Sequence, residues 1–192
     1  MEKRMVGGMM GVMVGLLILG LFPGWAGASV VGQWHVEGLM TVTVSLQGYG
    51  SNSASARFVD YFAFYTDGSF GMIDAHGAWT QSGKKFSVNL DPYALSRYFS
   101  EGLYASVGNT RVTVTKAVIS GSENRSGNAI RGQIAITTDI YLYAHSVNGK
   151  IRVTGNFVGY QAGYAFDSEP GSETKSFKDA LAEALNSLED ED

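Results

Sequence analysis

The chain of 192 residues contains no cysteine. Disulfide bonds, thiolate metal sites and thiol catalysis are therefore excluded, and packing and hydrogen bonds alone must hold the fold together. Only three histidines and three prolines occur, and charged residues make up 17% of the chain. The sequence has no phosphate-binding loop, dinucleotide fingerprint or Gly-X-Ser-X-Gly nucleophile motif. We expect a protein that is not an enzyme and that uses no cofactor and no metal.

The first 28 residues form a segment of their own. A short charged start precedes an apolar and glycine-rich run from Met5 to Phe22, and Ala26-Gly27-Ala28 follows as a small-residue cleavage pattern. This order is typical of a secretory signal peptide, so we predict that residues 1–28 are removed and that the mature chain begins at Ser29. A retained membrane anchor is the alternative, because the apolar run just reaches spanning length. We expect export to the periplasm or the extracellular space.

Charge divides the mature chain into two parts. Residues 29–166 carry ten Lys/Arg against eight Asp/Glu, whereas residues 167–192 carry two Lys against nine Asp/Glu. A nucleic-acid-binding protein needs a clustered basic face, which neither part offers. The distribution of charged residues predicts one nearly neutral domain at 29–166 and an acidic tail at 167–192. It also predicts that nucleic acid is not among the partners.

Alternation of apolar and polar side chains dominates the domain. From Trp34 to Leu46, for example, Met40, Val42 and Val44 fall on one face and Thr41 and Thr43 on the other. Such a period of two indicates a half-buried strand. Tight turns such as Asp67-Gly68 and Asn148-Gly149 separate the runs. We predict a polar loop at 47–55 and strands at 34–46, 56–65, 70–75, 77–81, 85–90, 111–121, 129–145 and 150–160.

Two segments break the alternation and have helical spacing instead. Asp91-Pro92 is a helix start and Gly102 a stop signal, which predicts a short helix at 92–101 in the middle of the domain. In the tail, apolar residues recur at helical intervals and predict an amphipathic C-terminal helix at 174–188. These residues are Phe177, Leu181, Ala184, Leu185 and Leu188.

About eight sequential strands joined by short turns predict an all-β fold, an antiparallel up-and-down β-barrel. Gly32-Gln33-Trp34, at the opening of the first strand, resembles the signature of the lipocalin and calycin families. The resemblance implies that Trp34 closes one end of the barrel and that a late arginine, for which Arg152 is the candidate, packs across it. It also implies that the barrel binds a small apolar ligand.

Candidate site residues come mainly from the aromatics, which exceed what a small barrel needs for closure. Their first use is packing, but part of them can line an apolar cup with the helix at 92–101 as its lid. The proposed lining comprises Phe62, Phe64, Phe70, Trp79, Tyr98 and Phe99.

The sequence spacing of the three histidines, His35, His76 and His145, does not match any metal-binding motif. Asp60, Asp74 and Asp139 interrupt apolar strands; we interpret them as outward surface charges, with an inward carboxylate pair as the alternative.

Three hypotheses of function follow. The first is an exported lipocalin-like barrel that binds a small apolar ligand. The second is an eight-stranded outer-membrane barrel, which needs a chain of about this length and carries aromatic belts. The third is a structural or interaction protein of the cell envelope, because the predicted strand at 56–65 is apolar on both faces. The oligomeric state stays open.

Overall fold

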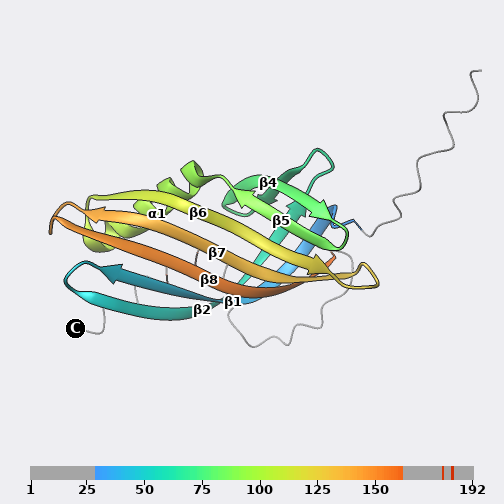
Figure 1. The fold of residues 1–192 in the computed structure, drawn as a ribbon, viewed down its shortest axis with the longest axis horizontal. Helices are drawn as coiled ribbons and strands as arrows, with labels where there is room; N and C mark the ends of the chain where they lie inside the picture. Colours follow the sequence, from blue (N-terminus) through green and yellow to red (C-terminus); the bar gives the residue numbers. More distant parts are fainter. Residues whose placement is uncertain (1–28, 162–178, 180–182, 184–192) are drawn as a thin grey trace, which may run out of the picture.

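The computed structural model describes residues 29–161 together with Asp179 and Glu183. Eight strands follow one another around a closed barrel, each antiparallel to its neighbours, and the last pairs with the first (Figure 1). The prediction of an all-β, eight-stranded, up-and-down barrel is confirmed. The elements are β1 (Gly32–Leu46), β2 (Gly50–Phe64), β3 (Ser69–Met72), β4 (Ala75–Ser82), β5 (Lys85–Leu90), α1 (Pro92–Val107), β6 (Thr110–Glu123), β7 (Ala129–Leu142) and β8 (Val147–Gln161).

The predicted signal peptide at 1–28 lies outside the described residues. So does the predicted C-terminal helix at 174–188, except for Asp179 and Glu183, which are both helical and exposed.

The strands differ greatly in length, and this shapes the barrel. β3, β4 and β5 are short, so β2 pairs with β3 only through Ala63 and Phe64. Likewise β5 pairs with β6 only along 118–122. Within the described part of the chain, residues 50–62 of β2 therefore pair with β1 alone. Residues 110–117 of β6 likewise pair with β7 alone. The barrel wall is fully paired at one end and open along β2 at the other.

Helix α1 packs against β6 beside this open section (Figure 1). Its first turn is set as predicted, because the Asp91 carboxylate accepts a hydrogen bond from the Tyr93 N–H at 2.8 Å and proline follows the cap. The predicted end at 101 is wrong. Gly102 lies inside the helix, which continues to Val107 and ends at Gly108, where φ is +74°. A glycine in a helix interior lowers stability but does not stop the helix when its apolar face is buried.

The predicted polar loop at 47–55 is also largely wrong, because β2 begins at Gly50. The serines of this segment lie on the outer face of the strand and pair with hydroxyls of β1. Thr41 bonds Ser55 at 2.9 Å and Thr43 bonds Ser53 at 2.8 Å. Small polar residues thus form a strand here because a neighbouring strand supplies a matching row of hydroxyls.

The inner face of the barrel is mainly apolar on the long strands, with Asp60, Thr110, Glu123 and Thr138 as buried polar exceptions. Trp34, Val36, Met40 and Val42 of β1 are fully buried, and isoleucines dominate the inner face of β7. In β6 the register shifts between Val114 and Lys116. This bulge turns Ala117 inward and Lys116 outward, whereas a strict period of two counted from Val114 would place them the other way round.

Candidate functional site

Four of the predicted lining residues meet in one aromatic cluster inside the fully paired end of the barrel. Phe64 lies edge-to-face with Phe70, with centroids 5.1 Å apart, and with Trp79 at 5.4 Å. Phe62 pairs with Phe70 in the same way at 5.3 Å. The three phenylalanines are at most 2% exposed. Such close T-shaped packing makes this cluster a part of the core.

The other two predicted lining residues lie on α1. Phe99 is fully buried, and together with Leu95 and Leu103 it forms the stripe that packs on the barrel. Tyr98 is half-buried beside Phe99, with ring centroids 6.0 Å apart. Burial raises the pKa of the Tyr98 hydroxyl, and the carboxylates of Asp74 and Asp179 raise it further. Four of the six predicted residues thus lie on strands and two on α1, and all six belong to or pack against one hydrophobic core.

Trp34 is fully buried at the start of β1. Its indole N–H donates to the Val30 carbonyl at 2.7 Å, and Gly32 two residues earlier has φ +129°. The implied partner is wrong: Arg152 is exposed on the outer face, opposite Thr43 and Thr137. Trp34 instead lies opposite Gln161 and Phe62. The registers place Arg152 nine residues along β8 from the position that faces Trp34.

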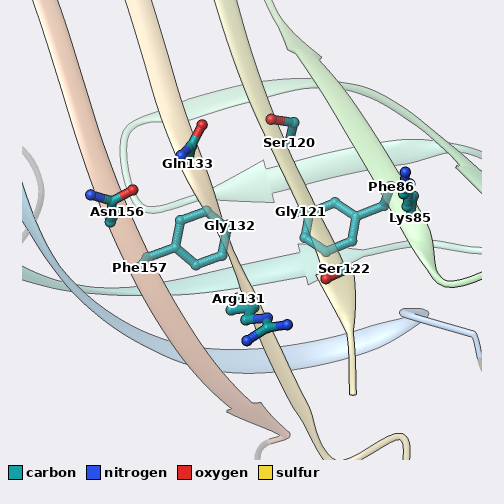
Figure 2. Close-up of a pocket in the computed structure, with 10 residues that line it drawn as sticks. All are labelled: Lys85, Phe86, Ser120, Gly121, Ser122, Arg131, Gly132, Gln133, Asn156 and Phe157. Atoms are coloured by element: carbon teal, nitrogen blue, oxygen red, sulfur yellow. The ribbon is translucent and has the colours of Figure 1, made fainter. Parts of the chain in front are cut away.

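Inward-facing glycines are covered by phenylalanines of neighbouring strands, a relationship that sequence reasoning missed. The Phe157 ring extends over Gly132 and the Phe86 ring over Gly121 (Figure 2). Phe58 covers Gly38 in the same manner. Glycine-aromatic pairs of this kind stabilise bends in a curved sheet. Only the register of the strands reveals them, because the partners are far apart in sequence.

The three aspartates singled out from the sequence lie in different surroundings. Asp60 is 1% exposed, so its assignment to the surface is wrong; its Oδ1 accepts from the Tyr61 and Ile73 N–H groups at 2.6 and 3.2 Å. Backbone donors at the β3–β4 turn make this burial tolerable. Asp74 and Asp139 are exposed as expected, and Asp139 lies 3.4 Å from the Lys150 ammonium.

A second buried carboxylate, Glu123, was not singled out from the sequence. It is 5% exposed at the end of β6, and its Oε2 has no hydrogen-bond partner among the described residues. Burial raises the pKa of this carboxyl, while the Lys84 ammonium partly opposes the shift. It lies beyond the end of the predicted strand at 111–121, in a polar stretch that the structure adds to β6, so no local pattern marks it.

The described residues contain no group of three or more acidic or histidine side chains placed to hold a metal ion. His35 lies against Tyr61 at 5.1 Å, and His76 Nε2 lies 3.1 Å from the Asp91 carboxylate. His35 and His76 thus each have a local structural neighbour, whereas His145 is exposed after the end of β7.

An open groove of about 560 Å³ crosses the outer face of β5 to β8 (Figure 2). Two cations, Lys85 and Arg131, flank Ser122 on adjacent strands, and the amides of Gln133 and Asn156 lie in the next row. All these side chains point to solvent, so the groove offers weak polar contacts only.

The open section of the barrel near α1 is the stronger candidate for a ligand site. Val44 and Leu46 of β1 and Ala54 of β2 point inward there, and all three are only partly buried. They continue the apolar inner face beyond the reach of β3, β4 and β5. Apolar side chains that line an incompletely covered interior can hold an apolar molecule by area burial.

Comparisons with known proteins add little. No protein-family model matches the chain, and no curated protein matches its sequence. Among solved structures, the chain is similar to Ail, the attachment invasion locus protein of Yersinia pestis. The identity is 10%, the match covers 68% of this chain and 98% of that one, and the TM-score is 0.24. A similarity of this size carries no argument about function. Among the described residues, no helix is long and apolar enough to cross a membrane.

Proposed function

We propose that this protein is an exported, water-surrounded β-barrel that binds a small apolar ligand at the open section beside α1. The observation that carries the proposal is the polarity of the two faces. The inner face is built from aromatic and branched aliphatic side chains, whereas the outer face carries Thr, Ser and charged residues, among them Arg57, Lys116 and Arg152. A barrel embedded in lipid needs the opposite arrangement.

The hydroxyl pairs between β1 and β2 support the same conclusion. Three such pairs follow one another along the outer face, and the third joins Ser45 and Ser51 at 3.1 Å. All three are exposed, and water satisfies the remaining donors and acceptors of these hydroxyls. In a hydrocarbon environment that hydration would be absent.

A fluorescent fatty-acid probe, titrated into the purified mature chain, tests the proposal. Ala54→Trp would fill the open section, and we expect it to weaken binding about tenfold or more, because the bulky ring occupies the apolar volume. Ala78→Trp is the matched control, because Ala78 is exposed on the outer face of β4. Absence of saturable binding, or equal binding by both variants, would refute the proposal.

The outer-membrane alternative has one observation in its favour. Exposed tyrosines lie near both ends of the barrel, Tyr61 and Tyr160 at one and Tyr143, beside the half-buried Tyr141, at the other. Outer-membrane barrels carry aromatic girdles at these levels. Between them, however, the outer face carries hydroxyls and charges such as Thr41 and Arg152 beside the exposed Leu39 and Val158, and is not a continuous apolar band. Cell fractionation distinguishes the two: recovery only in detergent extracts of membranes would favour the alternative and remove the ligand proposal.

The third function, an envelope interaction protein, is supported by an apolar patch on the outer face. Leu39, Tyr61 and Val158 are 53%, 51% and 46% exposed, and Tyr160 adjoins them. Patches of this kind mark interaction sites. A solution mass that rises with concentration, and that returns to the monomer value in Val158→Asp, would identify the patch as a contact between copies.

A further inference from the structure

The groove on the outer face of β5 to β8 crosses the wall where two glycines lie opposite each other. Gly121 of β6 pairs with Gly132 of β7, and both line the groove (Figure 2). Six polar side chains surround this glycine pair, and we call them the groove cluster: Lys85, Ser120, Ser122, Arg131, Gln133 and Asn156. All of them stand on strands, which hold side chains more precisely than loops do.

The register of the strands arranges the groove cluster in two rows. The cationic row runs across β5, β6 and β7 and consists of Lys85, Ser122 and Arg131. The amide row runs across β6, β7 and β8 and consists of Ser120, Gln133 and Asn156. Along β6 and β7 the rows are two residues apart, which corresponds to about 7 Å. Charged donors and neutral donors therefore lie side by side in one groove.

The fold does not use these side chains for its own hydrogen bonds. Within residues 29–161, no side chain of the groove cluster forms a hydrogen bond or an ion pair. Other polar groups of the outer face do find partners: Thr41 bonds Ser55 at 2.9 Å, and the Lys150 ammonium lies 3.4 Å from Asp139. The donors and acceptors of the groove cluster thus remain available to a ligand.

The groove is positive, although the whole chain carries a net charge of −4. Of the described residues that line it, Lys85 and Arg131 are cations and none is acidic. Glu37 lies in line with the cationic row, but Val158 stands between it and Arg131. Glu123 is buried on the inner face. An anion is therefore attracted to the cationic row.

We propose that the groove binds an anionic sugar, a hexose unit that carries a carboxylate or a phosphate. The anionic group lies over Ser122, where the Arg131 guanidinium offers two parallel N–H donors and the Lys85 ammonium adds a further charge-assisted bond. Side-chain amides both donate and accept, so Gln133 and Asn156 match the hydroxyls of the ring. A hexose ring with its anionic substituent is long enough to reach both rows.

Two properties of the groove define this class of ligand. Single contacts from solvated side chains are weak, so binding requires a ligand that engages both rows at once, which a bare anion and a neutral sugar do not. Single-stranded nucleic acid also needs exposed aromatic rings for stacking, whereas Phe86 and Phe157 are only 3% exposed.

The inference does not rest on the proposed apolar ligand. The open section beside α1 lies on the inner face, where Leu46 pairs with Gly149, seven residues along β8 from Asn156. The two sites are therefore separate, and saturating sugar should leave the affinity for the fatty-acid probe unchanged.

An NMR titration of the mature chain tests the proposal with glucuronate and glucose-6-phosphate. Acetate, inorganic phosphate and glucose serve as partial ligands. We expect saturable shifts of amides at 120–122 and 131–133, and an affinity for the anionic sugars about tenfold or more above that for each partial ligand. No saturable shift with either anionic sugar would overturn the proposal. Equal affinity for inorganic phosphate would overturn it too, since this shows a site for an ion only.

Paired substitutions test the cationic row. Lys85→Ala with Arg131→Ala should weaken binding of glucuronate about tenfold or more, because charge-assisted bonds are lost. Lys116→Ala with Arg152→Ala is the matched control, since it removes the same charge from exposed positions outside the groove. Unchanged amide signals of β1 report that both variants are folded. Equal weakening in the two variants would show general attraction of anions and refute the site.

The amide row has its own test. Gln133→Ala with Asn156→Ala should lower the affinity for glucose-6-phosphate about tenfold and leave the affinity for inorganic phosphate unchanged, because only the sugar hydroxyls lose partners. An unchanged affinity for glucose-6-phosphate in this variant would exclude recognition of the ring.

The source of the sugar is distinguished by the form in which it is offered. A glucuronate oligomer that binds about tenfold or more tightly than the monomer identifies a polymer as the ligand, and equal affinity identifies the free sugar. Phosphatidylglycerol vesicles provide anionic lipid without a sugar. Shifts of the groove amides with these vesicles, but with neither sugar, would overturn the proposal in favour of a membrane contact.

Discussion

The ring of Phe157 occupies the space in which Gly132, on the neighbouring strand, would carry a side chain. A Cβ built on Gly132 would lie 2.6 Å from Phe157 Cζ, and it would also meet the backbone of β6 (Figure 2). Phe157 in turn lies edge-to-face with Phe62 at 5.2 Å. The glycine thus lets one strand pass close beneath the aromatic cluster, and the curvature of the barrel depends on this pair.

Gly132→Ala should destabilise the barrel by about 2–4 kcal/mol, because both a packed ring and the adjacent backbone must move. Gly102→Ala is the control. Nothing lies within 4 Å of its added Cβ, and alanine in the helix interior should stabilise by up to about 1 kcal/mol. Urea unfolding of both variants measures the two effects. Equal stability of the two variants would contradict the role assigned to Phe157.

Trp34→Phe should lower the free energy of unfolding by about 2–3 kcal/mol. It removes a buried indole N–H that bonds the Val30 carbonyl, and it leaves a void in the core. Trp79→Phe removes a comparable bond to the Tyr65 carbonyl at 2.9 Å, but this bond is exposed, so the loss should be smaller. The shift of the urea midpoint at constant m-value compares them. A larger loss at Trp79 would contradict the account.

Ser96→Ala should loosen α1 from β6. The Val114 N–H at the β-bulge loses its acceptor, which costs about 1 kcal/mol. Ser100→Ala is matched in helix position, but Ser100 bonds only the Ser96 carbonyl of its own helix. Hydrogen exchange at Val114 should rise in the first variant and stay unchanged in the second. A similar response of both variants would show that the Ser96 contact does not anchor the helix.

Glu123→Gln should stabilise the protein at neutral pH. Burial raises the pKa of the Glu123 carboxyl, so the folded state binds the proton more tightly than the unfolded state. Stability then falls as pH rises from the ordinary value of 4.5 through the raised pKa. The glutamine variant escapes this loss, so we expect a gain in Tm of a few degrees at pH 7 that disappears near pH 4.

Glu101→Gln is the control for this pH dependence. Its carboxylate is exposed and pairs with Arg97 at 2.7 Å on the surface of α1, so the substitution should change Tm little at either pH. A gain at Glu123 that is the same at pH 4 and pH 7 would exclude titration of this carboxyl as its cause.

The architecture could be predicted from the sequence because alternation and turn chemistry are local signals. Asp67-Gly68 illustrates this: Gly68 takes φ +83°, and the Asp67 carboxylate accepts from the Ser69 N–H at 2.9 Å. Where a signal depends on a partner, prediction failed. The serines of β2 resemble a loop in sequence and form a strand because the hydroxyls of β1 lie beside them. Gly102 resembles a stop signal, but α1 continues past it and buries Leu103 in the core.

The candidate site was less predictable than the fold. Counting aromatics identified Phe62, Phe64 and Phe70, but composition does not tell a packed cluster from a lined cup, since both need the same residues. The site that we propose beside α1 depends instead on the short pairing between β2 and β3. Strand length and register are set jointly by two segments, so neither segment reveals them alone.

By itself, the sequence determined the class of the protein: a cysteine-free chain whose side chains alternate through eight strands, with a helix begun by Asp91-Pro92. Tertiary structure decided which of those side chains meet, because register brings together residues that are distant along the chain. In the folded barrel, Phe157 covers Gly132 and Arg152 lies on the outer face. Among the described residues, most of β2 pairs with a strand on one side only. Period and turn type are properties of neighbours in sequence, whereas closure of a barrel is a property of the whole sheet.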